Sequence, residues 1–278
     1  MPIQLNAPWT TATYVSFDTE TTGAYPLESE VCEVAAVKWK DGKVVDEFQS
    51  LACISKPMST FIIGIHGITN EMCEGAPPMG EIIKKFHAFI QDSVLVAHHA
   101  PFDLGFLALE MERAGMKLPD NPVICSSLLS RKVFPDFPNH KLQTLIPLLG
   151  IQQGTAHRAL DDSRACLQVA IKCMEKLGPE TPLQKVLETQ GHKLYWKNYS
   201  MNDLRQHDVF GLLVDAIETG KTVEIGYRGT SADHKRPVKP QGIVRNPDGD
   251  YLVGYCEREK RSKRYYLNRI ASVSQLLV

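Results

Sequence analysis

The strand pattern over residues 14–20 constrains the fold of this chain more than any other feature. Apolar and polar residues alternate in it, so Val15 and Phe17 point to one face of the strand while Asp18 and Glu20 point to the other. A tight polar turn follows. The pattern predicts a buried strand with two carboxylates at its carboxyl end, the position at which α/β sheets place ligands.

The rest of the N-terminal part alternates between strand and helix patterns. Strand patterns over 31–39 and 44–54 flank Asp41-Gly42, a pair typical of hairpin turns. Apolar spacings then predict further elements in this order: helix 79–90, strand 94–97, helix 102–114, strand 121–125 and helix 160–177. Strands first, and then strands alternating with helices, predict a mixed α/β domain.

The C-terminal part has a different character. We expect a helix that Gly220 ends, and then short strands joined by tight turns: helix 203–219 and strands 222–227, 251–256 and 264–270. Short strands in so few residues predict a small β-barrel. Periodicity is weak between the two parts, so the chain divides into a domain over 1–178, a linker over 179–204 and a second domain, with a leading helix, over 205–278.

The composition of the 278 residues bounds the class of protein. No window approaches the ~18 consecutive apolar residues of a membrane span, and the first residues lack the basic and apolar regions of a signal peptide. We therefore expect a cytoplasmic protein without a membrane partner. The seven cysteines form no C-x-x-C pair, which argues against a disulfide framework and a thiolate zinc site.

The charge is distributed unevenly along the chain. The last 58 residues hold 12 of the 31 basic and 6 of the 32 acidic side chains, so this part carries a net charge of +6 and the rest −7. A cationic domain on an acidic body is typical of a handle for nucleic acid or another anion. A solvated basic face is the commoner cause of a charge excess, so charge alone leaves both interpretations open.

Further candidate site residues stand at the starts of two predicted helices. Asp103 ends the segment AHHAPFD, directly after the strand over 94–97, and His157 and Asp162 lie five residues apart in AHRALDDSRA. Taken singly, such acids are typical caps or first-turn residues that stabilise a helix by ~1 kcal/mol. Four carboxylates and one histidine together are the set that two-metal cleavage of a phosphodiester requires. Hard divalent cations ~3.5–4 Å apart take oxygen ligands, and a histidine accepts a proton from the attacking water.

At these residues the sequence resembles the DEDDh, or DnaQ-like, 3′-to-5′ exonucleases. The three motifs of that family occur in its order, as FDTETTG (17–23), HHAPFD (98–103) and HRALDD (157–162), and the resemblance covers about 13–177. It implies a ribonuclease H-like fold with a mixed sheet and a general base at His157. It also implies four carboxylate ligands for two divalent metal ions, Mg²⁺ or Mn²⁺: Asp18, Glu20, Asp103 and Asp162.

The resemblance extends to the segment IHGIT (65–69). It implies that His66 contacts the terminal nucleotide, with Thr21 and Ile68 as candidates for packing against the sugar and the base. An ordinary loop histidine is the alternative for His66. The family's second motif usually reads H-N-A-x-F-D, and His99 stands here at the Asn position. This departure leaves the ligands unchanged but bears on the local support of the site and on its pH optimum.

The C-terminal part resembles the WYL domain, a small Sm- or SH3-like β-barrel. The matching pieces are R-P-V-K-P (236–240) and R-Y-Y-L-N-R-I (264–270), while Asp250 replaces the tryptophan of the family's W-Y-L tripeptide. The resemblance implies a surface for nucleic acid or nucleotides, because aromatic rings stack on bases and arginine binds phosphate. The candidates are Tyr227, Arg236, Arg264 and Arg269. Packing inside the barrel is the alternative for tyrosines of this domain.

The sequence leaves three functions open. The first is a metal-dependent 3′-to-5′ exonuclease that hydrolyses DNA, single-stranded or at 3′ ends, to nucleoside monophosphates. The second is the same reaction on RNA. A pocket that requires the 2′-hydroxyl of the sugar would distinguish an RNA-specific enzyme from one that acts on DNA. The third is a nucleic-acid sensor in which the WYL-like domain gates the nuclease. We favour the first, with nucleic acid as the partner and DNA ahead of RNA.

Overall fold

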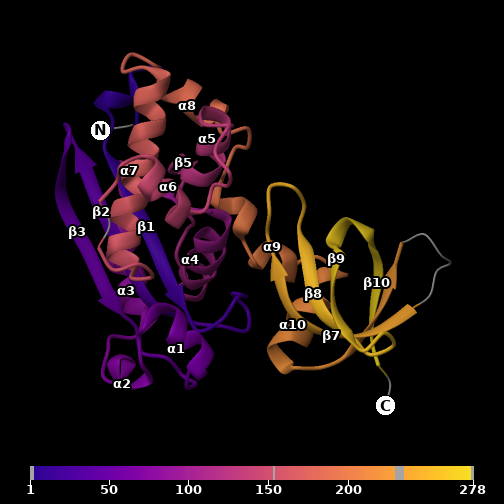
Figure 1. Ribbon diagram of the computed structural model, residues 1–278. Coiled ribbons are helices and arrows are strands. Elements are labelled where there is room, and N and C mark those ends of the chain that lie inside the picture. Colours follow the sequence, from indigo (N-terminus) through magenta and orange to yellow (C-terminus); the bar gives the residue numbers. More distant parts are fainter. Residues whose placement is uncertain (1–2, 153, 229–234, 277–278) are drawn as a thin grey trace.

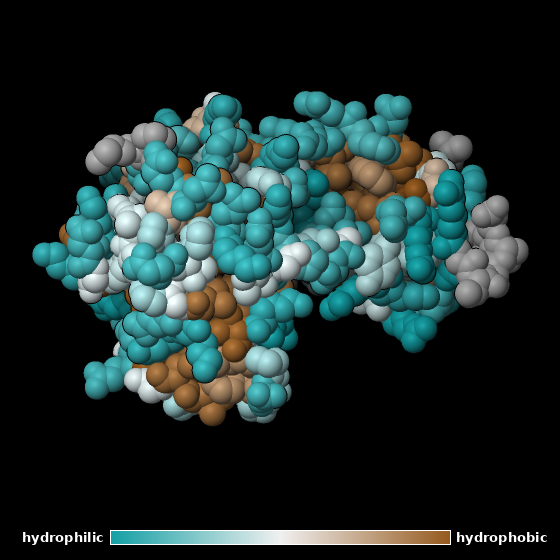
Figure 2. All heavy atoms as spheres, turned by 90° about the horizontal axis from the view of Figure 1, so that it is seen from above, coloured by the Kyte–Doolittle hydropathy of each residue, from teal (hydrophilic) through white to brown (hydrophobic). Residues whose placement is uncertain are grey.

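The computed structural model describes residues 3–152, 154–228 and 235–276, which form two parts that lie side by side (Figure 1). The N-terminal part is a mixed α/β domain, and the C-terminal part is built on a second, antiparallel sheet. Figure 2 shows a surface that is indented between the two parts on one side. Within the described ranges, no helix has the length and apolar character needed to cross a membrane.

The first sheet has five strands in the order β3-β2-β1-β4-β5. β1 lies in the middle, antiparallel to β2 and parallel to β4. The predicted hairpin between β2 and β3 is confirmed: Asp41 and Gly42 have φ angles of 50° and 82°, as a two-residue hairpin turn requires. The strands are β1 (Tyr14–Thr21), β2 (Val31–Lys40), β3 (Lys43–Leu51), β4 (Val94–Ala97) and β5 (Val123–Cys125).

Helices cover both faces of this sheet. Phe17 packs on one face with side chains of α3 and α4, whereas Tyr14 and Val96 pack on the other with side chains of α5 and α7. Both faces of β1 are therefore buried over Tyr14–Phe17, in agreement with the buried strand that the sequence predicts. The helices are α1 (Thr60–His66), α2 (Asn70–Cys73), α3 (Met79–Phe89), α4 (Pro101–Arg113), α5 (Ser126–Val133), α6 (Leu142–Leu148), α7 (Ala159–Leu177) and α8 (Leu183–Thr189), with 3-10 turns η1 (Trp9–Thr11) and η2 (Trp196–Tyr199).

The segment that the sequence predicts as a linker is folded, and several of its large apolar side chains are buried. Trp196 and Tyr199 are 1% and 2% exposed and belong to the same core cluster as Phe17, on which the Trp196 ring stacks with a centroid distance of 6.4 Å. Large aromatic side chains bury much apolar area, so this segment stabilises the N-terminal domain. The boundaries at 178 and 204 stay a prediction, and residues 229–234, 277 and 278 of the predicted second domain lie outside the described residues.

The C-terminal sheet is antiparallel, in the order β10-β6-β7-β8-β9. Its core includes Ile225, Val238 and Leu252, and side chains of α10 pack against them. The strand pairings run from β10 to β9 without joining these two edges in the described residues, so barrel closure stays a prediction. The elements are α9 (Asn202–Arg205), α10 (Phe210–Thr219), β6 (Val223–Tyr227), β7 (Lys235–Val244), β8 (Tyr251–Cys256), β9 (Arg261–Tyr266), η3 (Leu267–Arg269) and β10 (Ile270–Gln275).

Two local predictions for this part were wrong, and one strand was missed. The helix predicted over 203–219 is two helices, and the strand predicted over 264–270 ends at Tyr266, where η3 turns the chain into β10. The sequence analysis also missed β7, because Pro237 and Pro240 interrupt its strand pattern.

Candidate active site

Three carboxylates meet at the carboxyl end of β1. Asp18 and Glu20 extend from the same face of that strand, and Asp162 lies in the first turn of α7. One carboxylate oxygen of each residue lies within 4.8 Å of the others. Asp162 is buried, while Asp18 and Glu20 are partly exposed, so the cluster has a face that a ligand can reach.

The fourth predicted carboxylate lies beside this cluster but is not a member of it. Asp103, in the first turn of α4, is 2% exposed, and its Oδ1 accepts hydrogen bonds from the backbone N–H (3.0 Å) and the hydroxyl (2.8 Å) of Thr19. Thr19 stands between Asp18 and Glu20 on β1. These bonds fix Asp103 against the strand that carries the other two acids.

The acidic residues disfavour one another's charged forms. The pKa of Glu20 is raised to about 8, mainly by burial and in addition by the carboxylates of Asp162 and Glu33. Burial likewise raises the pKa of Asp18, and Asp103 is the charged neighbour that raises it most. Burial also raises the pKa of Asp103 to about 7, although the hydrogen bonds from Thr19 act in the opposite direction and lower it. A divalent cation removes this repulsion, and an all-oxygen donor set suits Mg²⁺ or Mn²⁺. The residues therefore fit a metal site.

This repulsion predicts how the stability of the metal-free protein depends on pH. The folded-state pKa of Glu20 is above its ordinary value of 4.5, so the folded protein binds a proton that the unfolded chain has lost between about pH 5 and pH 8. Stability therefore falls as the pH rises through this window. In EDTA, we expect a lower melting temperature at pH 8 than at pH 5, and a smaller difference for Glu20→Gln. If the melting temperature of Glu20→Gln fell by the same amount between pH 5 and pH 8 as that of the wild type, Glu20 would not be the cause of the pH dependence.

His157 lies at the open edge of the cluster. It is exposed, and its backbone N–H donates a hydrogen bond of 2.9 Å to Oδ2 of Asp162. Its φ angle of 58° places it in the left-handed region, in which histidine is more common than most residues. The backbone thus fixes the histidine relative to the carboxylate five residues later.

A buried ion pair that the sequence analysis missed supports this loop. Glu33 on β2 lies opposite Glu20 in the sheet, and its side chain is fully buried. It accepts hydrogen bonds from Gln49 Nε2 (2.8 Å), Arg158 Nη2 (3.0 Å) and the backbone N–H of Ala159 (3.2 Å). Arg158 directly follows His157, so the pair ties the start of α7 to the sheet. An acid inside the apolar run VCEVAAV was the available signal.

Glu33→Ala is expected to lower the free energy of unfolding by about 3 kcal/mol. Removal of one partner of a buried ion pair leaves the other charge uncompensated, and the loss is at the lower end of the usual range because Arg158 is one-third exposed. Urea unfolding measures it. Glu47→Ala is the matched control, since its pair with Arg164 is exposed and contributes about 1 kcal/mol or less. Equal losses in the two variants would contradict the role of Glu33.

The backbone conformation explains why a histidine, His99, can stand at the position where the family's second motif usually has asparagine. This residue has a φ angle of 60°, a left-handed conformation that asparagine adopts readily and histidine also adopts. We therefore expect His99→Asn to keep wild-type stability, whereas His99→Val lowers it by roughly 1–2 kcal/mol. Thermal unfolding of both variants tests this prediction, and equal destabilisation by Asn and Val would show that the side chain matters more than the backbone.

The three residues predicted to contact substrate are all buried. His66 is 5% exposed, and its Nδ1 accepts a hydrogen bond of 3.0 Å from the backbone N–H of Ile68. Ile68 is fully buried beside Cys32, and the Thr21 hydroxyl donates to the carbonyl of Gly23 (2.7 Å). Their contact with a nucleotide stays a prediction.

The four candidates of the C-terminal domain differ in their surroundings. Arg236 forms an ion pair with Glu259 (2.8 Å), and the Tyr227 hydroxyl accepts a hydrogen bond of 3.2 Å from the backbone N–H of Tyr266. Arg264 and Arg269 are exposed and lie over tyrosine rings. Within the residues that the structure describes, the last two form no ion pair, whereas the first two are engaged in the domain itself.

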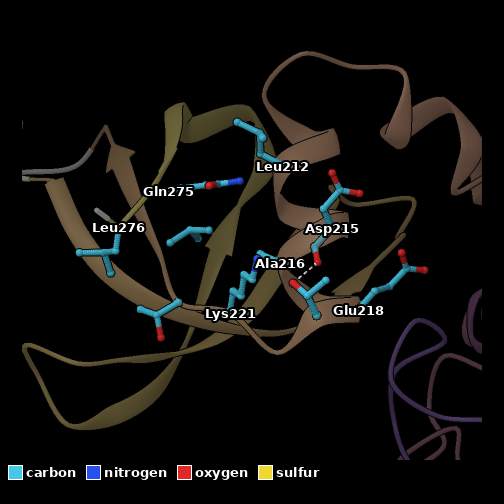
Figure 3. Close-up of a pocket in the computed structure, with 10 residues that line it drawn as sticks. Leu212, Asp215, Ala216, Glu218, Lys221, Gln275 and Leu276 are labelled. Carbon is cyan, nitrogen blue, oxygen red and sulfur yellow. Dashed lines mark hydrogen bonds between the residues drawn. The ribbon is translucent and has the colours of Figure 1, made fainter. Parts of the chain in front are cut away.

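The C-terminal domain also has a cavity of about 830 Å³ between α10 and the end of β10 (Figure 3). Asp215 and Glu218 of α10 line one side, and Gln275 and Leu276 lie opposite. No predicted site residue lines it. Asp215 and Glu218 outnumber the one cation of the lining, Lys221, so the cavity disfavours a polyanion.

Comparisons with known proteins agree with this geometry. The family model described as exonuclease matches residues 15–170, more than half of the chain, and the WYL domain model matches residues 208–275. Both resemblances seen in the sequence are thus confirmed.

Curated relatives are polymerases of which the chain matches a small part. The PolC-type DNA polymerase III of Bacillus cereus is 41% identical over 163 residues, which are 59% of this chain and 11% of the relative. That of Caldanaerobacter subterraneus subsp. tengcongensis is 37% identical over 247 residues, 88% of this chain and 17% of the relative. The chain therefore spans about a tenth to a sixth of the length of these relatives.

Solved structures of nucleases share the fold. Exonuclease X in complex with 5′ overhanging duplex DNA is 25% identical, with a TM-score of 0.50 over 64% of this chain and 99% of that chain. E. coli exonuclease I in complex with a dA16 oligonucleotide is 15% identical, with a TM-score of 0.54, and the match covers 88% of this chain and 55% of that chain. The chain belongs to the exonuclease family, and its exonuclease domain is followed by a WYL domain.

Proposed function

We propose that this chain is a metal-dependent 3′-to-5′ exonuclease that hydrolyses phosphodiester bonds of DNA, at single-stranded or 3′ ends, to nucleoside monophosphates. The observation that carries the proposal is the meeting of Asp18, Glu20 and Asp162 within 4.8 Å, next to an exposed His157, in a chain of the exonuclease family. The similarity to DNA polymerases and to a DNA-bound exonuclease supports DNA as the substrate.

Each site residue has a role in this proposal. Asp18, Glu20, Asp162 and the neighbouring Asp103 would hold two divalent ions, Mg²⁺ or Mn²⁺. Bound divalent ions supply activation of water and stabilisation of the charge on the leaving oxygen. His157 accepts the proton of the attacking water, because it is exposed at the edge of the cluster and is not required as a ligand.

DNA and RNA strands of matched sequence test the choice of substrate. We expect faster release of nucleoside monophosphates from DNA in Mg²⁺ or Mn²⁺, and no release in EDTA. Faster release from RNA would replace the proposal by an exoribonuclease. Binding of both strands without hydrolysis in any metal would replace it by a sensor that the WYL domain gates.

A further inference from the structure

The loop over residues 22–30 connects the active-site strand to the C-terminal domain. It begins two residues after Glu20, where the register of β1 against β2 shifts between Glu20 and Thr21. Such a bulge sets the direction of the side chains beside it. Two hydrogen bonds of 2.9 Å close the base of the loop, from the backbone N–H of Thr22 to the carbonyl of Glu30 and from the N–H of Glu30 to the hydroxyl of Thr22. A displacement of the loop therefore acts on the bulge at Glu20.

The C-terminal domain holds the tip of this loop. Leu27 is 6% exposed and belongs to the core cluster that contains Ile225 and Val238 of the second sheet. A Cβ atom added to Gly242 on β7 would overlap the ring of Tyr25, so the ring packs at a distance that only glycine permits. In Figure 1 this indigo loop extends from β1 toward the second sheet. The core of one domain thus contains a side chain from the active-site loop of the other.

Helix α4 makes a second connection of the same kind. Its first turn carries Asp103, and Leu109, which is 2% exposed, belongs to the core cluster of the C-terminal domain. Near the end of the helix, the Glu112 carboxylate accepts hydrogen bonds from the backbone N–H groups of Met201 (3.0 Å) and Asn202 (3.2 Å), at the start of α9. From Asp103 to Leu109 the helix rises by only about 9 Å. Asp103 therefore stands on a short rigid element whose other end packs in the C-terminal domain.

The loop and the helix also contact each other. A Cβ atom added to Gly105 of α4 would lie 3.5 Å from Cγ of Pro26, an ordinary packing distance, and Pro26 is buried. The two hydrogen bonds from Thr19 to Asp103 join the same helix to β1. Two of the four candidate metal ligands, Glu20 and Asp103, are therefore carried by elements that contact each other and that both reach the core of the C-terminal domain.

We propose that Tyr25, Leu27 and Gly242 are positioning residues for the acidic cluster. Their packing between the two domains holds Glu20 and Asp103 at the spacing that binding of two metal ions requires. The inference rests on the proposed function and adds that the C-terminal domain contributes to the reaction even when the substrate is a single nucleotide. A displacement of about 1 Å in an active site can lower the rate by roughly 100-fold, so a small change in this contact has a measurable effect.

Gly242→Ala in the full chain tests the proposal, because it changes the contact and no residue of the acidic cluster. The substrate is the p-nitrophenyl ester of thymidine 5′-monophosphate, which offers a single nucleotide and no strand that could extend to the second sheet. We expect kcat for release of p-nitrophenolate to fall by about 10-fold or more, with KM within about 2-fold of the wild type. The Kd of Mn²⁺, measured by titration without substrate, should rise by roughly 10-fold.

Substitutions of Tyr25 show whether the contact itself is responsible. Tyr25→Phe keeps the ring and should retain the wild-type kcat, whereas Tyr25→Ala removes it and should lower kcat. In the double variant Tyr25→Ala/Gly242→Ala, the added methyl group meets no ring, so kcat should be close to that of Tyr25→Ala alone. Residues in contact show such non-additive effects. Losses that multiply in the double variant would show that the two residues act separately, which contradicts the proposal.

Gly226→Ala is the matched control. Gly226 lies on β6 of the same sheet, and a Cβ atom there would overlap the hydroxyl of Ser272 in the C-terminal domain instead of a side chain of the exonuclease domain. This variant should have a lower melting temperature but the wild-type kcat and Mn²⁺ affinity. Wild-type values in Gly242→Ala, or equal losses in Gly226→Ala, would overturn the inference. If the wild-type protein hydrolyses neither the ester nor single-stranded DNA in Mg²⁺ or Mn²⁺, the proposed function fails instead, so the two failures are distinguishable.

Discussion

Asp162→Asn is expected to abolish turnover while the protein stays folded, with a melting temperature in EDTA at or above that of the wild type. The variant removes a charged oxygen from the three that lie within 4.8 Å, so we expect a loss greater than the roughly 10- to 100-fold that an outer partner of a metal ligand typically costs. It also removes a charge that raises the pKa values of Asp18 and Glu20, which relieves repulsion. Initial rates on labelled DNA and thermal unfolding measure both effects.

Asp161→Asn is the control for this prediction. Asp161 stands in the same turn of α7, but its oxygens accept from the backbone N–H of Thr155 (2.8 Å) and from Arg164 (3.0 Å) instead of joining the cluster. Its variant should keep activity. An inactive Asp161→Asn beside an active Asp162→Asn would show that the wrong acid has been assigned.

His157→Asn is expected to lower kcat by roughly 10²- to 10⁴-fold and to leave metal affinity unchanged. Asparagine tolerates the left-handed backbone at this position, where φ is 58°, but it cannot accept the proton of the attacking water. His157→Ala tests the same chemistry but adds a backbone cost of roughly 1–2 kcal/mol, so asparagine is the sharper variant. Titration with Mn²⁺ measures affinity. Loss of Mn²⁺ binding in His157→Asn would mean that the histidine is a ligand and not the base.

Local patterns predicted most of the N-terminal domain because each element carries its own signal. The period of two in β1, the Asp41-Gly42 turn and the helical spacing of α7 are all short-range features, and the structure has each of them. The acids could be predicted for the same reason, since strand ends and helix starts in an α/β fold converge on one edge of the sheet. β7 was missed because two prolines disrupt its pattern, and yet the structure places it in the middle of the second sheet, between β6 and β8.

What the sequence could not predict are interactions between distant parts of the chain. Glu33 and Arg158 are 125 residues apart, and no local pattern relates them. The same holds for Tyr25 and Gly242, which meet across the two domains. Of the four ligand candidates in the WYL domain, Arg236 is paired with Glu259, whereas Arg264 forms no ion pair in the described part of the chain, a difference that depends on the fold of the sheet.

A time course on a 5′-labelled single strand of DNA, resolved at single-nucleotide steps, tests the central claim most directly. The wild-type protein should shorten the strand from its 3′ end in a ladder that needs Mg²⁺ or Mn²⁺, that stops in EDTA and that is absent with Asp162→Asn. Cleavage at internal positions, loss of the label from the 5′ end, or the same ladder with Asp162→Asn would contradict a metal-dependent 3′-to-5′ exonuclease at this site.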